Sequence, residues 1–290
     1  MTIALGVICA LIAMFGWGVG DFLIQKNSRA IGSWKSLFFI SLFGAIILTP
    51  FITNELVQIL THPDVILVFL CAASIVLLAA ALLEFKSLKE GKLVVVEPLS
   101  ALEIPVSGML AFFFLSEAIS GMQILLIGLL IVGLILVSIK TDHLKARLWL
   151  EKGVLIAALS TLFMGTVNFL FGVGARQTSA LMINWFASVF LVVACLVYLF
   201  KAKKVKTLFA DMKTHSKSLF WMCFADNVAW ISFAFAMLLA PISISVALSQ
   251  SYIIITVLFG IYFNKEQIQT HQKVGLILSI AAAIILAITL

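Results

Sequence analysis

Charged side chains are scarce in this chain. Only 11% of its 290 residues are Asp, Glu, Lys or Arg, against about a quarter in a typical soluble domain. Apolar residues make up 63% of the sequence, and the mean hydropathy is +1.21. This excess of apolar side chains excludes a water-soluble enzyme, and it also excludes a disordered chain, which needs low hydrophobicity. The composition therefore predicts an integral membrane protein.

Metal-binding and nucleotide-binding patterns are also missing. The four cysteines lie in apolar segments without a CxxC pair, and the four histidines lie in loops or at segment ends. No GxxxxGK[ST] loop for ATP is present. We therefore expect no metal site, no cofactor and no catalytic residues. The net charge of +6 is attributed to loops facing anionic lipid and not to nucleic-acid binding.

What the sequence does contain is long apolar runs, which favour an all-α integral membrane fold over a barrel of short alternating strands. A transmembrane helix needs about 20 mostly apolar residues. Ten segments qualify: 3–24, 34–53, 65–85, 92–115, 121–139, 153–173, 179–200, 218–239, 242–263 and 272–290. The longest connection between them, 201–217, is too short for a soluble domain.

The basic residues predict the orientation of these spans. Of the 19 Lys and Arg residues, 18 lie in or beside loops that follow odd-numbered spans, and only Arg176 follows an even-numbered span. Because positive loops stay in the cytoplasm, we expect both termini outside the cell and the protein in the plasma membrane.

The two halves of the sequence look like copies of one unit. A shift of 147 residues aligns GVICALIAMFGWGVGDFL (6–23) with GVLIAALSTLFMGTVNFL, with six of 18 positions identical. In a separate match, Glu117 and Glu266 follow the fourth and ninth spans in similar contexts. A unit of five helices must reverse direction in its second copy. We therefore predict two inverted five-helix repeats, residues 1–140 and 141–290, with a substrate site where they meet.

Three passages resemble the EamA-like branch of the drug/metabolite transporter superfamily. They are Gly16-Trp17-Gly18 in the first span, the junction FKSLKEGKLVVVEPLSALEIP, and the small-residue fourth span that leads into Leu115-Ser116-Glu117. The resemblance covers nearly the whole chain and implies a ten-helix transporter of small metabolites. Members of this family are usually drawn with cytoplasmic termini, whereas the basic residues here predict external termini.

Acidic residues inside the spans are candidate site residues, because charge at membrane depth is costly. Glu103 lies near the middle of the fourth span, between Pro98 and Pro105. A carboxyl group beside the carbonyls that proline frees could bind a proton, a cation or a substrate amine. The alternative is a neutral Glu hydrogen-bonded between helices. Glu97, nearer the cytoplasmic end, is a second candidate that could equally pair with a neighbouring lysine.

The second half supplies further candidates for substrate or ion binding. Asp226 and Asn227 lie in the eighth span, and Trp230 follows one turn later on the face of Asp226. An acid beside an aromatic ring suits an amine or an aromatic solute; an interhelical hydrogen bond and a packing Trp are the alternative. The other candidates are Gln250 and Tyr252, which overlie the Glu103 segment in the repeat alignment, and Trp17. Polar contacts between helices would also explain Gln250 and Tyr252.

Other residues receive more local assignments. Asp21 and its repeat equivalent Asn168 are candidate gate residues, although Asp21 could instead pair with Lys26. Glu84 is expected at the membrane interface. Glu117 is expected to stabilise the start of the helix that follows it.

The spans also differ in their expected positions. We expect a cavity lined by spans 1, 3, 4, 6, 8 and 9, with the uniformly apolar spans 5 and 10 outside it, against lipid or a second copy of the chain. Gly128 and Gly133 in the fifth span are expected to allow close helix packing.

These observations favour a secondary transporter for a small amino acid or amine-like solute. Alternating access would carry the solute, with export as the expected direction and a proton or cation as a candidate coupling ion. A membrane-embedded enzyme is the first alternative, but its acidic residues would have to cluster, and here they are scattered. A flippase for lipid-linked intermediates is the second, but it would need basic residues inside the spans, and these are almost absent.

Overall fold

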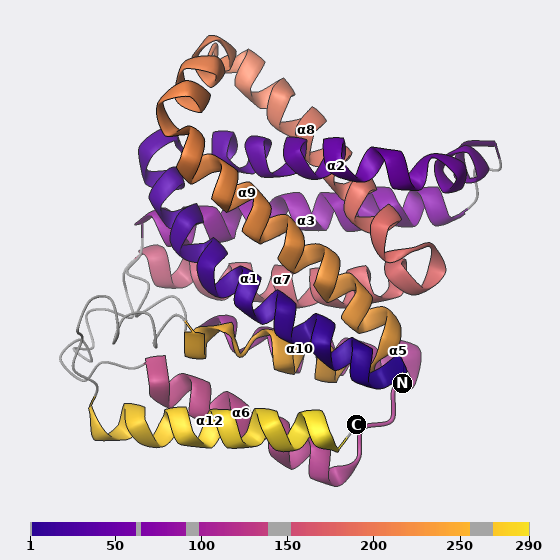
Figure 1. Cartoon of the computed structure of the whole chain (residues 1–290), viewed down its shortest axis with the longest axis vertical. Helices are drawn as coiled ribbons and strands as arrows, with labels where there is room; N and C mark the ends of the chain where they lie inside the picture. Colours follow the sequence, from indigo (N-terminus) through magenta and orange to yellow (C-terminus); the bar gives the residue numbers. More distant parts are fainter. Residues whose placement is uncertain (1, 62–64, 91–98, 139–151, 256–268, 290) are drawn as a thin grey trace.

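The computed structural model describes residues 2–61, 65–90, 99–138, 152–255 and 269–289, and every regular element in these ranges is helical (Figure 1). The first half of the chain holds α1 (Thr2–Ile31), α2 (Ser33–Thr61), α3 (Val65–Glu90), α5 (Glu103–Leu115) and α6 (Gly121–Ser138). The second half holds α7 (Lys152–Gln177), α8 (Ala180–Lys201), the short 3-10 helix η3 (Val205–Thr207), α9 (Leu208–Leu239), α10 (Ile242–Ser249) and α12 (Thr270–Ile288). The chain is therefore all-α within the described ranges.

Seven of the described helices are long and apolar enough to cross a membrane: α1, α2, α3, α7, α8, α9 and α12. Three shorter apolar helices lie within the other predicted spans, namely Glu103–Leu115, Gly121–Val137 and Ile242–Ile255. The chain is thus a multi-pass membrane protein. The predicted count of ten full spans stays a prediction, because segments 91–98, 139–151 and 256–268, next to the short helices, lie outside the described residues.

One connection differs from the sequence expectation. The segment 201–217 was expected to be a loop, but η3 and the first turns of α9 occupy most of it. Its lysine, leucine, alanine and methionine residues are good helix formers, whereas the span prediction counted only apolar runs. His215 departs from helical geometry with φ −113° and marks a kink where this polar extension meets the apolar part of α9.

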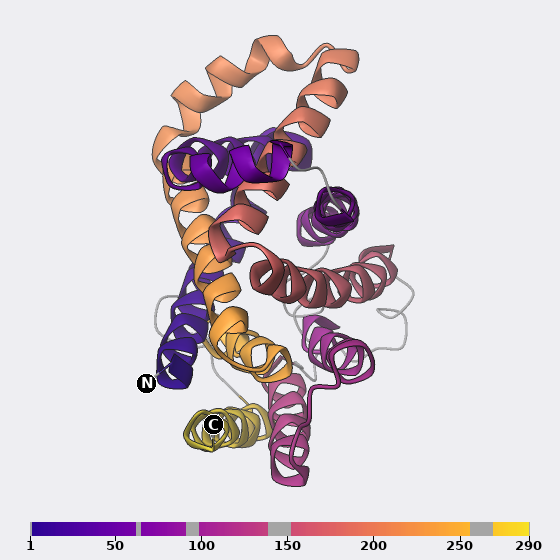
Figure 2. The same cartoon turned by 90° about the vertical axis from the view of Figure 1, so that its right-hand side faces the viewer.

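The helices pair across the two halves of the chain (Figures 1 and 2). Helix α1 packs on α9, α3 on α7, α2 on α8, and α6 on α12. Helix α7 is the repeat equivalent of α1, and α9 is the repeat equivalent of α3. The α1–α9 and α3–α7 pairs are therefore equivalent contacts in the two repeats. The α6–α12 pair forms a separate layer at one edge of the molecule. The start of α1 and the end of α12 lie on the same side (Figure 1).

Glycine sets the spacing of the α6–α12 layer. A Cβ atom on Gly133 would lie 2.7 Å from the backbone nitrogen of Ser279 and 2.9 Å from the carbonyl oxygen of Gly275. On Gly275 it would lie 2.7 Å from the carbonyl oxygen of Gly133. The close packing expected at Gly133 is therefore confirmed. The same expectation for Gly128 is wrong for the described part of the chain, where no atom lies within 4 Å of its added Cβ and the residue is exposed.

This contrast gives a stability prediction. We expect Gly133→Ala to lower the stability of the protein by about 1–3 kcal/mol, because the clash is with backbone atoms that cannot turn aside. Gly128→Ala, on the same helix, should be neutral or stabilise it by about 0.5–1 kcal/mol. Thermal unfolding of both variants in one detergent checks this, and equal melting temperatures would contradict it.

Candidate functional site

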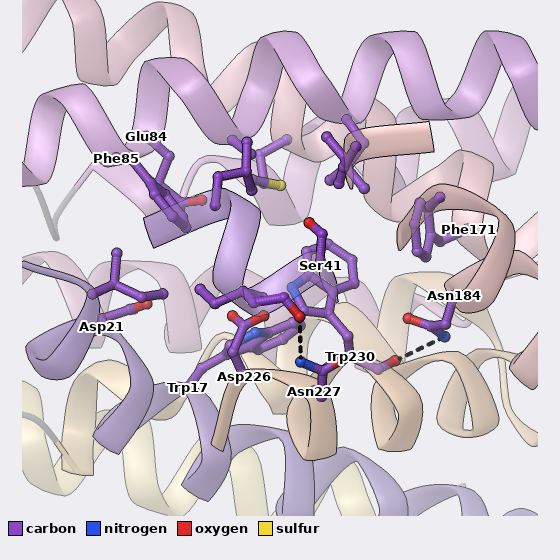
Figure 3. Close-up of a pocket in the computed structure, with 18 of the residues that line it drawn as sticks. Trp17, Asp21, Ser41, Glu84, Phe85, Phe171, Asn184, Asp226, Asn227 and Trp230 are labelled. Atoms are coloured by element: carbon purple, nitrogen blue, oxygen red, sulfur yellow. Dashed lines mark hydrogen bonds between the residues drawn. The ribbon is translucent and has the colours of Figure 1, made fainter. Parts of the chain in front are cut away.

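A cavity of about 80 Å³ lies among seven of the described helices and the end of α10 (Figure 3). Its polar lining comes from both halves of the chain: Asp21, Ser41, Glu84, Glu103, Asn168, Asn184, Ser188, Asp226, Asn227, Gln250 and Tyr252. A cavity needs roughly 10–15 Å³ to hold one water molecule. In this conformation it therefore has room for several waters or a very small solute.

The charge of the cavity is one-sided. Four carboxyl groups line it, those of Asp21, Glu84, Glu103 and Asp226, and no Lys, Arg or His is among the described lining residues. Asp21, Glu103 and Asp226 are buried, and Asp21 interacts electrostatically with each of the other two. A ligand that carries positive charge would complement this lining, whereas an anion would be repelled.

Glu103 is held by two amide side chains from the other half of the chain. Its Oε2 atom accepts hydrogen bonds from Asn168 Nδ2 at 2.9 Å and from Gln250 Nε2 at 2.7 Å. The Gln250 Oε1 atom is buried and has no hydrogen-bond partner among the described residues. A ligand with an N–H donor would satisfy this acceptor.

A break in the helix places Glu103 at the cavity. Residues 101–102 form a turn, and α5 begins at Glu103 itself. In the second half, α10 ends at Ser249 and residues 250–251 form a turn before Tyr252. These two turns occupy the same positions in the repeat, since the shift that aligns Glu117 with Glu266 carries 101–102 onto 250–251. Interrupted helices at equivalent positions of two repeats are typical of transporter binding sites.

Aromatic rings form one wall of the cavity. The Trp17 ring lies 5.3 Å from Trp230, 4.9 Å from Phe233 and 6.5 Å from Tyr252, measured between centroids. Phe171 lies 5.0 Å from Trp230. Four of these residues line the cavity directly: Trp17, Phe171, Trp230 and Tyr252. Aromatic faces beside carboxyl groups are a suitable surface for a cation.

The glycines on either side of Trp17 let its helix come close to its neighbours. A Cβ on Gly16 would lie 2.8 Å from the Ala229 Cβ atom and 2.9 Å from the Ala225 carbonyl oxygen, both on α9. A Cβ on Gly18 would lie 3.0 Å from the Ile255 side chain. The Gly-Trp-Gly motif therefore brings α1 against two neighbouring segments, while the tryptophan between the glycines faces the cavity.

Repeat-related residues meet at this cavity. The 147-residue shift carries Trp17 onto Met164, Asp21 onto Asn168 and Ile24 onto Phe171, and all six line the cavity. The two halves thus contribute equivalent positions of α1 and α7 to one site.

Comparison with known proteins identifies the family. The sequence model of the EamA-like transporter family matches this chain twice, over residues 4–139 and 151–288. The chain belongs to the EamA-like transporter family. Its members are membrane transporters of the drug/metabolite type and not enzymes.

A structural match supports the fold of this EamA-like chain. A protein of known crystal structure has a TM-score of 0.73 with 11% sequence identity, over 98% of this chain and 96% of that one. At this identity the match shows a shared fold alone. No curated protein matches the sequence closely enough to add a substrate.

The structure brings most of the residues predicted from the sequence to one place in the EamA-like fold. Trp17, Asp21, Glu103, Asn168, Asp226, Asn227, Trp230, Gln250 and Tyr252 all line the cavity. Glu97 lies outside the described residues. The peripheral position of spans 5 and 10 is confirmed, because no described residue of α6 or α12 lines the cavity.

Two expectations about the lining were wrong. The second and seventh spans were left out, yet Leu37, Ile40 and Ser41 of α2 and Asn184, Ala187, Ser188 and Leu191 of α8 line the cavity. These two spans contain no acidic residue, so the cost of buried charge did not indicate them. Glu84 was assigned to the interface, but it also lines the cavity because the bundle encloses this part of α3.

Helices α2 and α8 meet α9 through hydrogen bonds of uncharged amide side chains. Asn227 Nδ2 donates to the Ile40 carbonyl oxygen at 3.1 Å, and Asn184 Nδ2 donates to the Trp230 carbonyl oxygen at 3.4 Å (Figure 3). The uncharged amide Asn184 in an apolar span was the signal available in the sequence. Phe171 is the repeat equivalent of Ile24. The sequence alone did not indicate that Ile24 lines the cavity, so it did not indicate Phe171 either.

Glu117 stabilises a helix start, but of a different helix from the one expected. Its carboxylate accepts hydrogen bonds from the backbone nitrogens of Ile242 at 2.9 Å and Ser243 at 3.3 Å, at the start of α10. It also pairs with Arg176 at 2.9 Å. Arg176 in turn donates to the carbonyl oxygens of Met237 and Ala240, at the end of α9. This network joins the two halves at the side predicted to face outward.

The Glu117–Arg176 pair should therefore contribute to stability. We expect Glu117→Ala to lower the free energy of unfolding by about 1–3 kcal/mol, because it leaves backbone donors of α10 and the arginine without their charged partner. The effects of Glu117→Ala and Arg176→Ala should be non-additive, since each removes the same pair. A double-mutant cycle of thermal or denaturant unfolding in detergent checks this; additive losses would contradict the coupling.

Proposed function

We propose that this EamA-like protein is a secondary transporter of a small solute bearing a protonated amine, such as an amino acid or a simple amine. The observation that carries the proposal is the set of carboxyl groups around one cavity with no described basic residue among its lining. The buried Gln250 Oε1 atom adds an acceptor for an N–H group.

The aromatic wall supports a cationic ligand independently of the acids. Trp17 and Trp230 lie edge to face, with an angle of 82° between their ring planes. A cation near an aromatic face gains about 0.5–2 kcal/mol, the larger value when water is excluded. The carboxyl groups would attract the cationic solute, and the aromatic rings would form a surface that fits it.

The cavity volume favours a small substrate. About 80 Å³ is well below the roughly 300 Å³ at the lower end of drug-sized ligand sites. A flippase for lipid-linked intermediates would need a larger and basic cavity, and the acidic lining opposes a phosphate-bearing substrate. An embedded enzyme would need a metal or an activated nucleophile, and no group of three metal-binding side chains is found among the described residues.

Alternating access is the proposed mode of movement. The cavity lies between halves whose helices pair across the repeat, so a rocking of one half against the other would expose it to each side in turn. In this proposal Asp21 and Asn168 are gate residues, because they occupy equivalent positions of α1 and α7 and line the cavity from both halves. Export across the plasma membrane, with external termini, completes the proposal.

Glu103 is the proposed coupling residue. It is 4% exposed, and its hydrogen-bond donors both come from the opposite half of the chain, so the bonds to Asn168 and Gln250 would change when the halves move. A carboxyl group in this position can hold either a proton or the ammonium group of a substrate, and exchange of one for the other would couple their movements.

The test of this role is transport by Glu103→Gln in proteoliposomes. We expect the variant to fold, because glutamine keeps the size and the hydrogen-bonding capacity of glutamate, and to lose proton-driven transport of the amines that the wild type carries. A panel of primary amines and amino acids should be assayed with and without a pH gradient, in both directions.

Glu55→Gln is the matched control, since Glu55 lies outside the cavity and accepts a hydrogen bond from Ser179 Oγ that glutamine can also accept. It should transport as the wild type does. A wild-type rate and pH profile for Glu103→Gln would show that Glu103 is structural only. Preference of the wild type for anionic solutes would overturn the substrate class.

A second test addresses the aromatic wall. We expect Trp230→Ala to raise the KM for a transported amine about 2- to 30-fold, corresponding to the loss of one cation–π contact. Trp221→Ala on the same helix should leave the KM unchanged, because Trp221 is 57% exposed and lies outside the cavity lining. Equal effects of the two substitutions would contradict a binding role for Trp230.

A further inference from the structure

A second pocket lies away from the cavity, where the end of α1 and the start of α2 meet the ends of α3 and α8. Its volume is about 360 Å³. Its lining includes Trp34, Lys35, Lys86, Lys89, Tyr198 and Lys204. The basic-residue count predicts that this end of the helices faces the cytoplasm.

The pocket is strongly basic. Four lysines line it against the single carboxyl group of Glu90. Lys35 is paired with Asp211 of α9. The other three make no ion pair with another described residue and are exposed: Lys86 and Lys89 lie near the end of α3, and Lys204 lies between α8 and η3. Their exposure allows their ammonium groups to contact an anion from outside the chain.

The start of α2 adds backbone donors to the same pocket. Gly32, with φ +95°, turns the chain between α1 and α2, and α2 begins at Ser33. The first N–H groups of a helix lack partners within the helix and favour anions such as phosphate. Ser33, Trp34 and Lys35 all line the pocket, so these donors lie beside the lysines.

The remaining walls are those of a membrane interface. The Trp34 and Tyr198 rings stack with centroids 3.9 Å apart and an interplanar angle of 11°, and they join α2 of one half to α8 of the other. Leu82, Leu83 and Leu199 add apolar surface. Tryptophan and tyrosine concentrate at headgroup depth in membranes. A soluble phosphate would use the lysines and the helix start but not this apolar wall.

We propose that this pocket binds the phosphate headgroup of an anionic phospholipid from the cytoplasmic leaflet. The lysines and the start of α2 hold the phosphate, and the leucines and the aromatic stack contact the glycerol and upper acyl chain. The site is independent of the proposed transport substrate, because none of its lining residues lines the central cavity.

The test is the stabilisation of the purified full-length protein by added lipid. Phosphatidylglycerol, phosphatidylcholine and sodium phosphate are titrated separately into the protein in a neutral detergent, and thermal unfolding is followed. We expect phosphatidylglycerol to raise the melting temperature, with little effect of the other two. The triple variant Lys86→Gln/Lys89→Gln/Lys204→Gln should bind this lipid roughly 100-fold more weakly, given a contribution of about fivefold for each lysine near an anionic lipid.

The matched control is Lys206→Gln/Lys213→Gln/Lys217→Gln, which removes the same charge from exposed lysines outside the pocket lining. It should keep the wild-type response. An equal loss in the control, equal stabilisation by phosphatidylcholine, or equal stabilisation by sodium phosphate would overturn the proposal. If the triple variant does not fold, Lys86→Gln and Lys204→Gln alone should each weaken binding severalfold, and a wild-type affinity in both would overturn it equally.

Discussion

Carboxyl groups gathered in a membrane interior need positive charge to accompany them, and this constraint organises the structure. Asp21, Glu103 and Asp226 are buried around one cavity that has no described basic residue in its lining. Unpaired charge in a medium of low dielectric constant is expensive. Protons or a cationic solute could supply the missing charge, and this is the basis of the proposed transport function.

The rest of the fold presents these groups to one another. Glu103 reaches the cavity at a helix break that is repeated at residues 250–251, and its hydrogen-bond partners come from the opposite half. Gly16 and Gly18 bring α1 close to its neighbours, so that Trp17 faces the same space. The contacts at the ends of the bundle also join the halves: Glu117 with Arg176 at one end, and Lys35 with Asp211 at the other. Movement of one half against the other would have to change contacts of this kind.

Much of this arrangement was predictable from the sequence, for physical reasons. Apolar length identified the membrane helices, and the cost of buried charge pointed to Glu103 and Asp226. The repeat alignment pointed to Asn168, Gln250 and Tyr252. Contacts between distant segments were not predictable: Glu117 caps α10 and not the helix after it, and the lining from α2 and α8 consists of apolar and uncharged polar side chains. Local sequence gives the periodicity of a helix but not the neighbour against which each face packs.

The most direct test of the account is proton release on ligand binding. A panel of amines, neutral analogues and anions is added to the purified protein in weakly buffered detergent solution, and the pH change is recorded for the wild type and for Glu103→Gln. The account predicts that only protonated amines bind and displace protons from the wild type, and that Glu103→Gln releases measurably fewer. Binding of anions without proton release, or equal release from both proteins, would contradict it.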